Sequence, residues 1–237
     1  MITAFSTDYH THTIASGHGS FDTITDLARA AGKKGLRILG ITDHAPSFPG
    51  SAKESYFRSL LSAPKTKLGV EMRYGVELDI LDPEGHVALS DELLSKLDYS
   101  IISLHGKVIS SMGCEDNTRG MIAAMDHPGV LIIGHPDDDE FPLDLEKLLF
   151  YAQKKRVYPE INNASLMPGA YRRGCKKNCT EILRICKKLS LPVFLSSDSH
   201  GAKHVGDLSY AIELLSETGF PDELIINRAG GLCPPGI

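Results

Sequence analysis

Short apolar runs that end in histidine or a carboxylate residue recur along this chain and restrict the folds open to it. Six runs end in this way: Ile2–Phe5 before Asp8, His10 and His12; Leu36–Thr42 before Asp43 and His44; Val70–Val76 before Glu77; Tyr99–Leu104 before His105; Val130–Ile133 before His135; and Val193–Ser197 before Asp198 and His200. Strands that repeatedly end in metal-ligating residues are typical of a parallel β/α barrel, which carries its chemistry at the C-terminal rim.

Strand and helix patterns alternate along the whole chain. We expect strands near residues 3–8, 37–42, 70–77, 99–104, 130–133, 157–161 and 192–196, and helices over 22–33, 53–62, 90–96, 118–126, 143–155, 176–189 and 207–218. This alternation predicts an α/β fold with a parallel sheet. An open sheet would place ligands mainly at one switch point, whereas here nearly every strand supplies one, so we predict a barrel. A length of 237 residues suits one domain over 1–237.

Composition excludes some classes of protein. The net charge of −5 and the mixed charges argue against a surface that wraps a nucleic acid polymer. No apolar run approaches the roughly 20 residues that cross a bilayer, and the N-terminus lacks the features of a signal peptide. We therefore expect a cytoplasmic protein without a membrane partner.

The chain has five cysteines: Cys114, Cys175, Cys179, Cys186 and Cys233. An odd number without a disulfide-framework spacing predicts reduced thiols. Cys175, Cys179 and Cys186 have helical spacing, which favours packing on one buried helix stripe over zinc binding.

Nine residues are candidate metal ligands: His10, His12, His18, His44, Glu77, His105, His135, Asp198 and His200. Residues two apart on a strand point to the same face, so His10 and His12 can hold one ion, as can Asp198 and His200. Glu77 has two oxygens that could bridge two ions. A single such histidine is more often structural, but nine candidates at successive strand ends predict two or three metals, since one zinc ion takes about four ligands.

Further polar residues surround these candidates. Asp8 and Asp43 are expected to support the ligands, because ligating histidines usually donate their other ring N–H to a carboxylate or carbonyl. Glu160 and Asn162 end the sixth strand and are expected to line the pocket as supporting residues or substrate contacts. Arg172 and Arg173, in the loop Asn162–Gly174, and Lys107 are candidate phosphate contacts, and His204 is a candidate proton donor to a leaving group. Each of these four could equally be a solvated surface residue.

Seven motifs follow one another along the chain: Asp-Tyr-His-Thr-His-Thr at 8–13, Ile-Thr-Asp-His at 41–44, Gly-Val-Glu at 75–77, the lone His105, Gly-His-Pro at 134–136, Glu-Ile-Asn-Asn at 160–163 and Ser-Asp-Ser-His at 197–200. Together they resemble the PHP (polymerase and histidinol phosphatase) family. The loop His12–Thr23 with its His18, and the pair Asn162-Asn163, are most similar to its YcdX-type phosphatase branch. Single motifs of this kind are weak, but seven in order over about Thr7 to Gly206 are specific.

The resemblance implies a distorted seven-stranded (β/α)7 TIM-like barrel of the PHP type with three divalent metal ions, commonly zinc and sometimes manganese or iron. By that resemblance His10, His12, Asp198 and Glu77 would hold the first ion, Glu77, His105 and His135 the second, and His18, His44 and His200 the third. It also implies a phosphoesterase that cleaves a small phosphomonoester with a metal-activated hydroxide, with no protein nucleophile. A homotrimer and a short C-terminal cap after Asn227 are further expectations.

Several alternatives remain open at this point. A histidinol-phosphate phosphatase or a nucleotide or oligonucleotide phosphoesterase would use the same barrel, although the absence of Trp and 7% aromatic residues disfavour stacking on nucleic acid. A non-catalytic metal-binding module would be expected to lose ligands, and this chain keeps all nine. A barrel metallohydrolase that cleaves amides typically adds a carboxylated lysine at a strand end, which is missing here.

Overall fold

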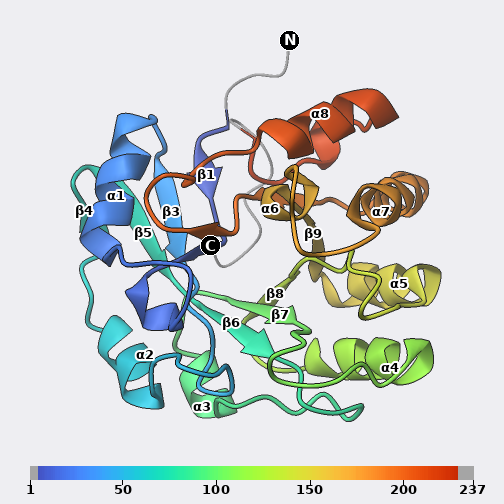
Figure 1. Cartoon of the computed structure of the whole chain (residues 1–237), viewed down its shortest axis with the longest axis horizontal. Coiled ribbons are helices and arrows are strands. Elements are labelled where there is room, and N and C mark those ends of the chain that lie inside the picture. Colours follow the sequence, from blue (N-terminus) through green and yellow to red (C-terminus); the bar gives the residue numbers. More distant parts are fainter. Residues whose placement is uncertain (1–4, 229–237) are drawn as a thin grey trace.

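The computed structural model describes residues 5–228 and arranges parallel strands at the centre with helices around them (Figure 1). The strands are β1 (Thr7–Asp8), β2 (Thr11–His12), β3 (Ile38–Ile41), β4 (Thr66–Lys67), β5 (Val70–Tyr74), β6 (Val76–Asp79), β7 (Ser100–Ser103), β8 (Val130–Ile133), β9 (Tyr158–Asn162), β10 (Phe194–Ser196) and β11 (Ser199–His200). The helices are α1 (Ile24–Lys33), α2 (Glu54–Leu60), α3 (Asp91–Leu94), α4 (Cys114–Ala124), α5 (Leu145–Lys155), α6 (Asn163–Leu166), α7 (Cys175–Leu189) and α8 (Ser209–Thr218), with 3-10 turns at Ile14–Ser16 and Asp222–Leu224. The α/β fold and its distorted parallel barrel are confirmed.

The strand expected over 70–77 is divided at Gly75 into β5 and β6, and this division joins the two main sheets. β5 lies beside β3 in one sheet, and β6 lies beside β7 in the other. A side chain at Gly75 would bring a Cβ within 2.6 Å of the Tyr99 carbonyl oxygen, so only glycine fits at the break. The β6 segment stays bonded to the chain after β3, because the Ala45 N–H donates to the Glu77 carbonyl over 2.8 Å. Glu77 therefore lies where the two sheets meet.

A side chain and a short strand pair close the remaining gap between β10 and β1. The Asn227 carboxamide accepts from the Leu195 N–H at 2.9 Å and donates to the Leu195 carbonyl at 2.6 Å and the Thr7 carbonyl at 3.4 Å. Nearer the rim, β11 pairs in parallel with β2, which sets His200 beside His12. The Asn227 side chain thus makes hydrogen bonds to Leu195 and Thr7 like those that a neighbouring strand would make. The C-terminal cap expected beyond it, residues 3–4 of the first expected strand, and Cys233 lie outside the described residues.

The inside of the barrel is filled below its rim. A small cluster of buried side chains occupies this position: Tyr9, Tyr99, Ile101, Ile132, Phe194 and Ile226. Tyr9 contacts Tyr99 and Phe194 edge to face, at ring-centroid distances of 5.7 and 5.4 Å. Ile102 belongs instead to the larger cluster between strands and helices, as the two-residue alternation of a strand requires. The packed interior forces any ligand chemistry to the rim.

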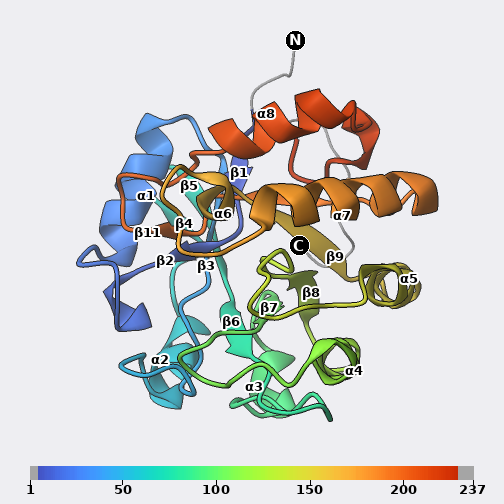
Figure 2. The same cartoon turned by 45° about the vertical axis from the view of Figure 1, so that its right-hand side comes forward.

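The helices follow the expected amphipathic pattern with two differences in extent. The region expected to be helical over 90–96 is a single turn, α3, and the helix expected over 118–126 begins earlier, at Cys114. Helices α7 and α8 lie side by side in both views (Figure 2), and the three cysteines of α7 are buried as expected. Within residues 5–228 the longest helices fall short of the length and apolarity needed to span a bilayer.

Candidate metal centre

All nine predicted metal ligands meet at the C-terminal rim of the barrel. Each of the main parallel strands or the loop directly after it contributes at least one of them, apart from β5, which continues into β6, and β9, whose end supplies supporting residues. The nine are buried or half-buried. The spacing of the motifs along the sequence therefore becomes proximity in space because parallel strands all end at one edge.

Glu77 lies at the centre of this group, with its two oxygens directed at different histidines. Oε1 lies 2.9 Å from His135 Nε2 and 3.3 Å from His105 Nε2. Oε2 lies 2.8 Å from His44 Nδ1, 3.4 Å from His10 Nε2 and 3.5 Å from His12 Nε2. A fully buried carboxylate with this division is suited to bridge two cations.

Ligand-type atoms at the rim lack the partners that buried polar atoms normally have. Among the residues described, six of them face one another but make no hydrogen bond of normal geometry: His10 Nε2, His12 Nε2, His44 Nδ1, Glu77 Oε2, His105 Nε2 and His200 Nε2. Leaving such atoms unsatisfied costs about 1–3 kcal/mol each. Three overlapping triads have ligand atoms within 4.8 Å of one another: His12, His44, His200; His10, His12, Glu77; and His44, Glu77, His105. Divalent cations fit this donor set and would satisfy its orphaned atoms.

His18 reaches the centre from the loop after β2. Its Nε2 lies 3.0 Å from His44 Nε2, and both rings stack with Phe48, at centroid distances of 4.7 and 4.1 Å. A Cβ on Gly19 would lie 2.8 Å from His200 Cδ2, so this loop packs closely against the ligand on β11. Phe48 was not expected from the sequence, because a lone aromatic residue in a loop carries no periodic signal.

Three carboxylates orient the histidine rings from behind. Glu160 accepts from His10 Nδ1 at 2.8 Å, and Asp79 accepts from His105 Nδ1 at 2.7 Å. Asp43 acts on His12 through the Ser16 hydroxyl, which lies 2.6 Å from Asp43 Oδ1 and 2.9 Å from His12 Nδ1. Such partners fix the tautomer that leaves the opposite nitrogen free for a metal.

Asp8 has different partners from those expected of a carboxylate that orients a histidine. It accepts from the Ser197 N–H at 3.1 Å, the Ser197 hydroxyl at 2.5 Å and the Gly206 N–H at 2.7 Å. These bonds tie the end of β10 to the first strand just before Asp198. Asp8 therefore holds the loop that carries two ligands and contacts no histidine ring.

Two ligands sit in strained backbone conformations. His135 has φ of 27° and Asp198 has φ of 51°, which are values that residues with side chains rarely adopt. Strain of this kind persists where the surrounding structure holds it, most often at functional sites. It turns both side chains out of the strand direction and into the shared centre.

Burial and mutual proximity divide the histidines into two electrostatic groups. Burial opposes a charge on His10 and His105, but nearby carboxylates outweigh it and raise both pKa values, that of His105 to about 9. Burial and the neighbouring rings of His200 and His44 lower the pKa of His12 and bring that of His18 to about 4. Because metals bind neutral imidazole, filling the first group must release protons.

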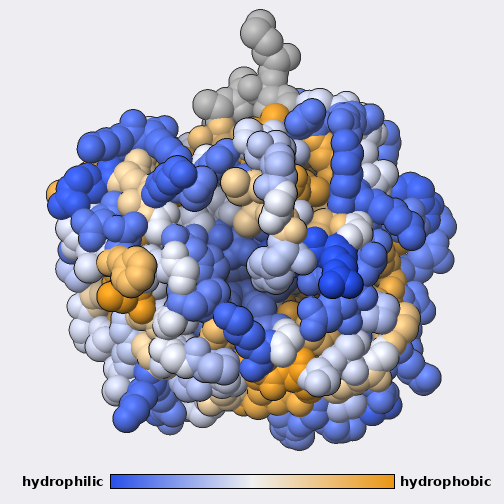
Figure 3. All heavy atoms as spheres, viewed as in Figure 1, coloured by the Kyte–Doolittle hydropathy of each residue, from blue (hydrophilic) through white to orange (hydrophobic). Residues whose placement is uncertain are grey.

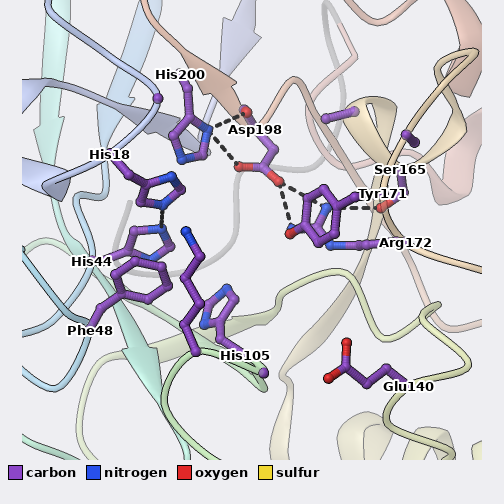
Figure 4. Close-up of a pocket in the computed structure, with 15 residues that line it drawn as sticks. His18, His44, Phe48, His105, Glu140, Ser165, Tyr171, Arg172, Asp198 and His200 are labelled. Carbon is purple, nitrogen blue, oxygen red and sulfur yellow. Dashed lines mark hydrogen bonds and ion pairs between the residues drawn. The ribbon is translucent and has the colours of Figure 1, made fainter.

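A cavity of about 550 Å³ opens onto one side of the centre. Its wall includes His18, His44, His105, Asp198 and His200, with Phe48, Lys107, Glu140, Ser165, Tyr171 and Arg172 beside them (Figure 4). Figure 3 shows a hollow with hydrophilic surroundings near the middle of this face. A small polar molecule can therefore reach the rim from solvent.

Arg172 is the predicted cation that the structure brings closest to the centre. Its Nη1 and Nη2 donate to Asp198 Oδ2 at 3.0 and 3.1 Å, and its side chain is only 6% exposed. The ammonium group of Lys107 lies 5.6 Å from the Phe48 ring centroid on the same wall. Each could contact an anion in the cavity.

Four of the residues predicted to contact the substrate or donate a proton do not line the cavity within the described part of the chain: Glu160, Asn162, Arg173 and His204. Glu160 and Asn162 are fully buried beneath the centre, where Asn162 Nδ2 donates to Asp198 Oδ2 at 3.1 Å. This position favours the supporting role for both over substrate contact. His204 Nδ1 lies 3.9 Å from Asp207 Oδ2, and its role as a proton donor stays a prediction.

Known proteins resemble this chain in sequence and in fold. The family model of the PHP domain matches residues 8–164, which hold seven of the nine ligands. The chain belongs to the PHP domain family. A probable phosphatase of Caldanaerobacter subterraneus is 42% identical over 223 residues, covering 94% of this chain and 87% of the relative. One of Clostridium novyi is 37% identical over 220 residues, covering 93% and 89%.

A solved structure shares the fold at lower identity. The histidinol phosphate phosphatase of Lactococcus lactis, in complex with zinc, L-histidinol and phosphate, superposes with a TM-score of 0.61 at 19% identity, covering 92% of this chain and 95% of that one. By homology this chain is a phosphatase, a hydrolase of phosphoric esters, and its buried histidine and glutamate groups suit a metal site.

Proposed function

We propose that this chain hydrolyses a small phosphomonoester with three divalent ions, zinc by preference, held by the nine ligands at the rim. One observation carries the proposal. Six buried ligand atoms without hydrogen-bond partners converge beside a cavity that also holds Arg172 and Lys107. Imidazole-rich sites suit zinc, and manganese or iron would also be accepted.

Bound cations would supply Lewis-acid charge for the phosphoryl oxygens and lower the pKa of a water molecule that attacks phosphorus in line. The residues of the chain would bind and orient the substrate. Within the described residues, the hydrogen bonds of Arg172 come from Nη1 and Nη2 alone. Its Nε–H would therefore be free to donate to a phosphoryl oxygen while Nη1 and Nη2 stay bonded to Asp198. Lys107, which lines the same cavity, would add a second positive charge.

The size and charge of the cavity favour a small monoester. A volume of about 550 Å³ lies in the lower half of the range of small-molecule sites. The net charge of −5 provides no general attraction for a polyanion. L-histidinol phosphate belongs in a substrate screen, because the Lactococcus enzyme was solved with L-histidinol and phosphate. A single domain over 1–237, a cytoplasmic location and a homotrimer remain predictions.

The test combines metal content with hydrolysis of p-nitrophenyl phosphate, before and after chelation and after addition of zinc or manganese. We expect two to three ions per chain, and activity that is lost and then restored. His105→Gln removes a predicted ligand, so metal affinity and the rate of hydrolysis should each fall by at least the roughly 10- to 100-fold typical of losing a residue that only supports a ligand. His86→Gln removes a histidine whose side chain is 72% exposed and serves as the matched control.

The diester bis-p-nitrophenyl phosphate distinguishes the alternatives. Preference for the diester would favour a nucleotide or oligonucleotide phosphoesterase. Metal-replete protein that hydrolyses neither compound nor any screened phosphometabolite would contradict the proposal and favour a non-catalytic module.

A further inference from the structure

We propose that Ser165 and Asp137 are positioning residues that hold the Arg172 guanidinium toward the phosphoryl group of the substrate. The inference rests on the proposed phosphatase function, and goes beyond it by assigning roles to two residues behind the cavity wall. Neither is a candidate ligand, and both come from segments that follow barrel strands.

Arg172 is held at two points. Its Nη1 donates to the Ser165 hydroxyl oxygen at 3.0 Å and to Asp198 Oδ2 at 3.0 Å, and its Nη2 donates to the same Asp198 oxygen at 3.1 Å. Asp198 is itself a predicted metal ligand, with Oδ1 at 3.2 Å from His12 Nε2. A cation bound to Asp198 would reduce the negative charge that attracts Arg172. The hydrogen bond from Arg172 to Ser165 would then matter more for the position of the guanidinium group.

The Ser165 hydroxyl has only one direction available for its proton. Its oxygen accepts from Arg172 Nη1, because a guanidinium group can only donate, and the same oxygen lies 3.2 Å from Asp137 Oδ1. Ser165 must therefore donate to Asp137 and present a lone pair to Arg172. Asp137 thus fixes the orientation of the Ser165 hydroxyl group, and that hydroxyl group fixes the orientation of the Arg172 guanidinium group.

The buried position of Asp137 is not explained by a contribution to the stability of the fold. It is fully buried, and its only side-chain partners within the described residues are the Ser165 hydroxyl and the Cys179 thiol, with Sγ at 3.2 Å from Oδ2. Burial raises the pKa of its carboxyl group to about 6. A buried carboxyl group with two weak neutral donors costs folding free energy, whereas a role in orienting Arg172 gives a reason for its position.

The test is a double-mutant cycle read out by inorganic phosphate as a competitive inhibitor of p-nitrophenyl phosphate hydrolysis. Ser165→Ala should raise the inhibition constant about tenfold, the worth of one hydrogen bond to a charged group. Arg172→Met should raise it further, and adding Ser165→Ala to Arg172→Met should then change nothing more. Asp137→Asn should weaken phosphate binding in the same direction without lowering the melting temperature.

Controls separate this role from folding and from the metal site. Ser100→Ala removes a buried hydroxyl that has no hydrogen-bond partner and should leave phosphate binding unchanged. Ser165→Thr, which keeps the hydroxyl, should restore binding. Metal content is measured for every variant and should stay at the level of the parent protein.

Specific results would overturn the inference. Additive effects of Ser165→Ala and Arg172→Met would mean that Ser165 acts without Arg172. Tighter phosphate binding in Asp137→Asn would mean that Asp137 acts only as a repelling charge. A parent protein that neither hydrolyses the ester nor binds phosphate would instead refute the proposed function, so the two failures are distinguishable.

Discussion

Replacing Glu77 with Gln should empty two metal positions at once, because its two oxygens face different histidines. Oε1 lies near His135 and His105, and Oε2 near His44, His10 and His12. The glutamine side chain keeps the shape but loses the charge and offers one oxygen instead of two. We expect metal content to fall from about three ions per chain to one or fewer, with loss of hydrolysis.

The loss can be expressed as a change in stability. An ion present at about 100 times its dissociation constant stabilises the folded state by about 2.7 kcal/mol, so two lost ions correspond to about 5 kcal/mol. For a chain of this length, 1 kcal/mol shifts the melting temperature by about 2–4 °C. In the presence of added metal, the variant should therefore melt about 10–20 °C below the parent protein.

The assay is thermal melting of both proteins with and without a chelator, alongside elemental analysis. In the presence of chelator the difference should largely disappear, because the parent protein has then lost its ions as well. Glu92→Gln, an exposed glutamate paired with Lys96, is the control and should behave like the parent. A Glu77→Gln protein with three ions and an unchanged melting temperature would refute the bridging role.

Three further predictions concern other parts of the molecule. Asp43→Asn should weaken metal binding about 10- to 100-fold, since it disturbs the Ser16 hydroxyl that orients His12, and titration with a chromophoric chelator measures this. Gly40→Ala should destabilise the fold by about 1–3 kcal/mol, because its Cβ would lie 2.0 Å from the Tyr99 hydroxyl oxygen. Gly32→Ala in α1 should instead stabilise the fold by up to about 1 kcal/mol, because the nearest atom to its Cβ would lie 3.6 Å away. Denaturant unfolding of the two variants measures both changes. Iodoacetamide at pH 8 should label the exposed Cys114 first among the four described cysteines. Burial raises the pKa of the Cys175 and Cys186 thiols to about 12 and raises that of Cys179 as well, so these three should react only after unfolding. Peptide mass spectrometry measures the order of labelling.

The nine predicted ligands come together in the structure because all of them follow strand ends. A parallel barrel converts the recurrence of His, Asp and Glu after apolar runs into one cluster, so the order of motifs carries three-dimensional information. Asp79 was missed, although it stands two residues after Glu77 on the same strand. The spacing argument that paired His10 with His12 applies equally to Glu77 and Asp79, and would have pointed to it.

Other parts of the site carry no such signal. Ser16 and Ser165 come from loops and a one-turn helix, and their partners Asp43 and Asp137 are 27 and 28 residues away along the chain. Hydroxyl groups that bond across such separations follow from the way loops pack at the rim, which neither period nor propensity describes. The same holds for Asn227, whose carboxamide closes the barrel against Leu195 and Thr7.

We expect the predicted metal site and the fold to depend on each other. The rim combines strained backbone at His135 and Asp198 with six buried ligand atoms that lack hydrogen bonds within the described chain. Each of these features disfavours the folded state in the absence of cations, by about 1–3 kcal/mol apiece. The packed interior beneath, from Tyr9 to Phe194, supplies stability that does not depend on metal. The barrel therefore holds an arrangement at its rim that is unfavourable by itself, and cations that bind there would satisfy the orphaned atoms and stabilise the fold.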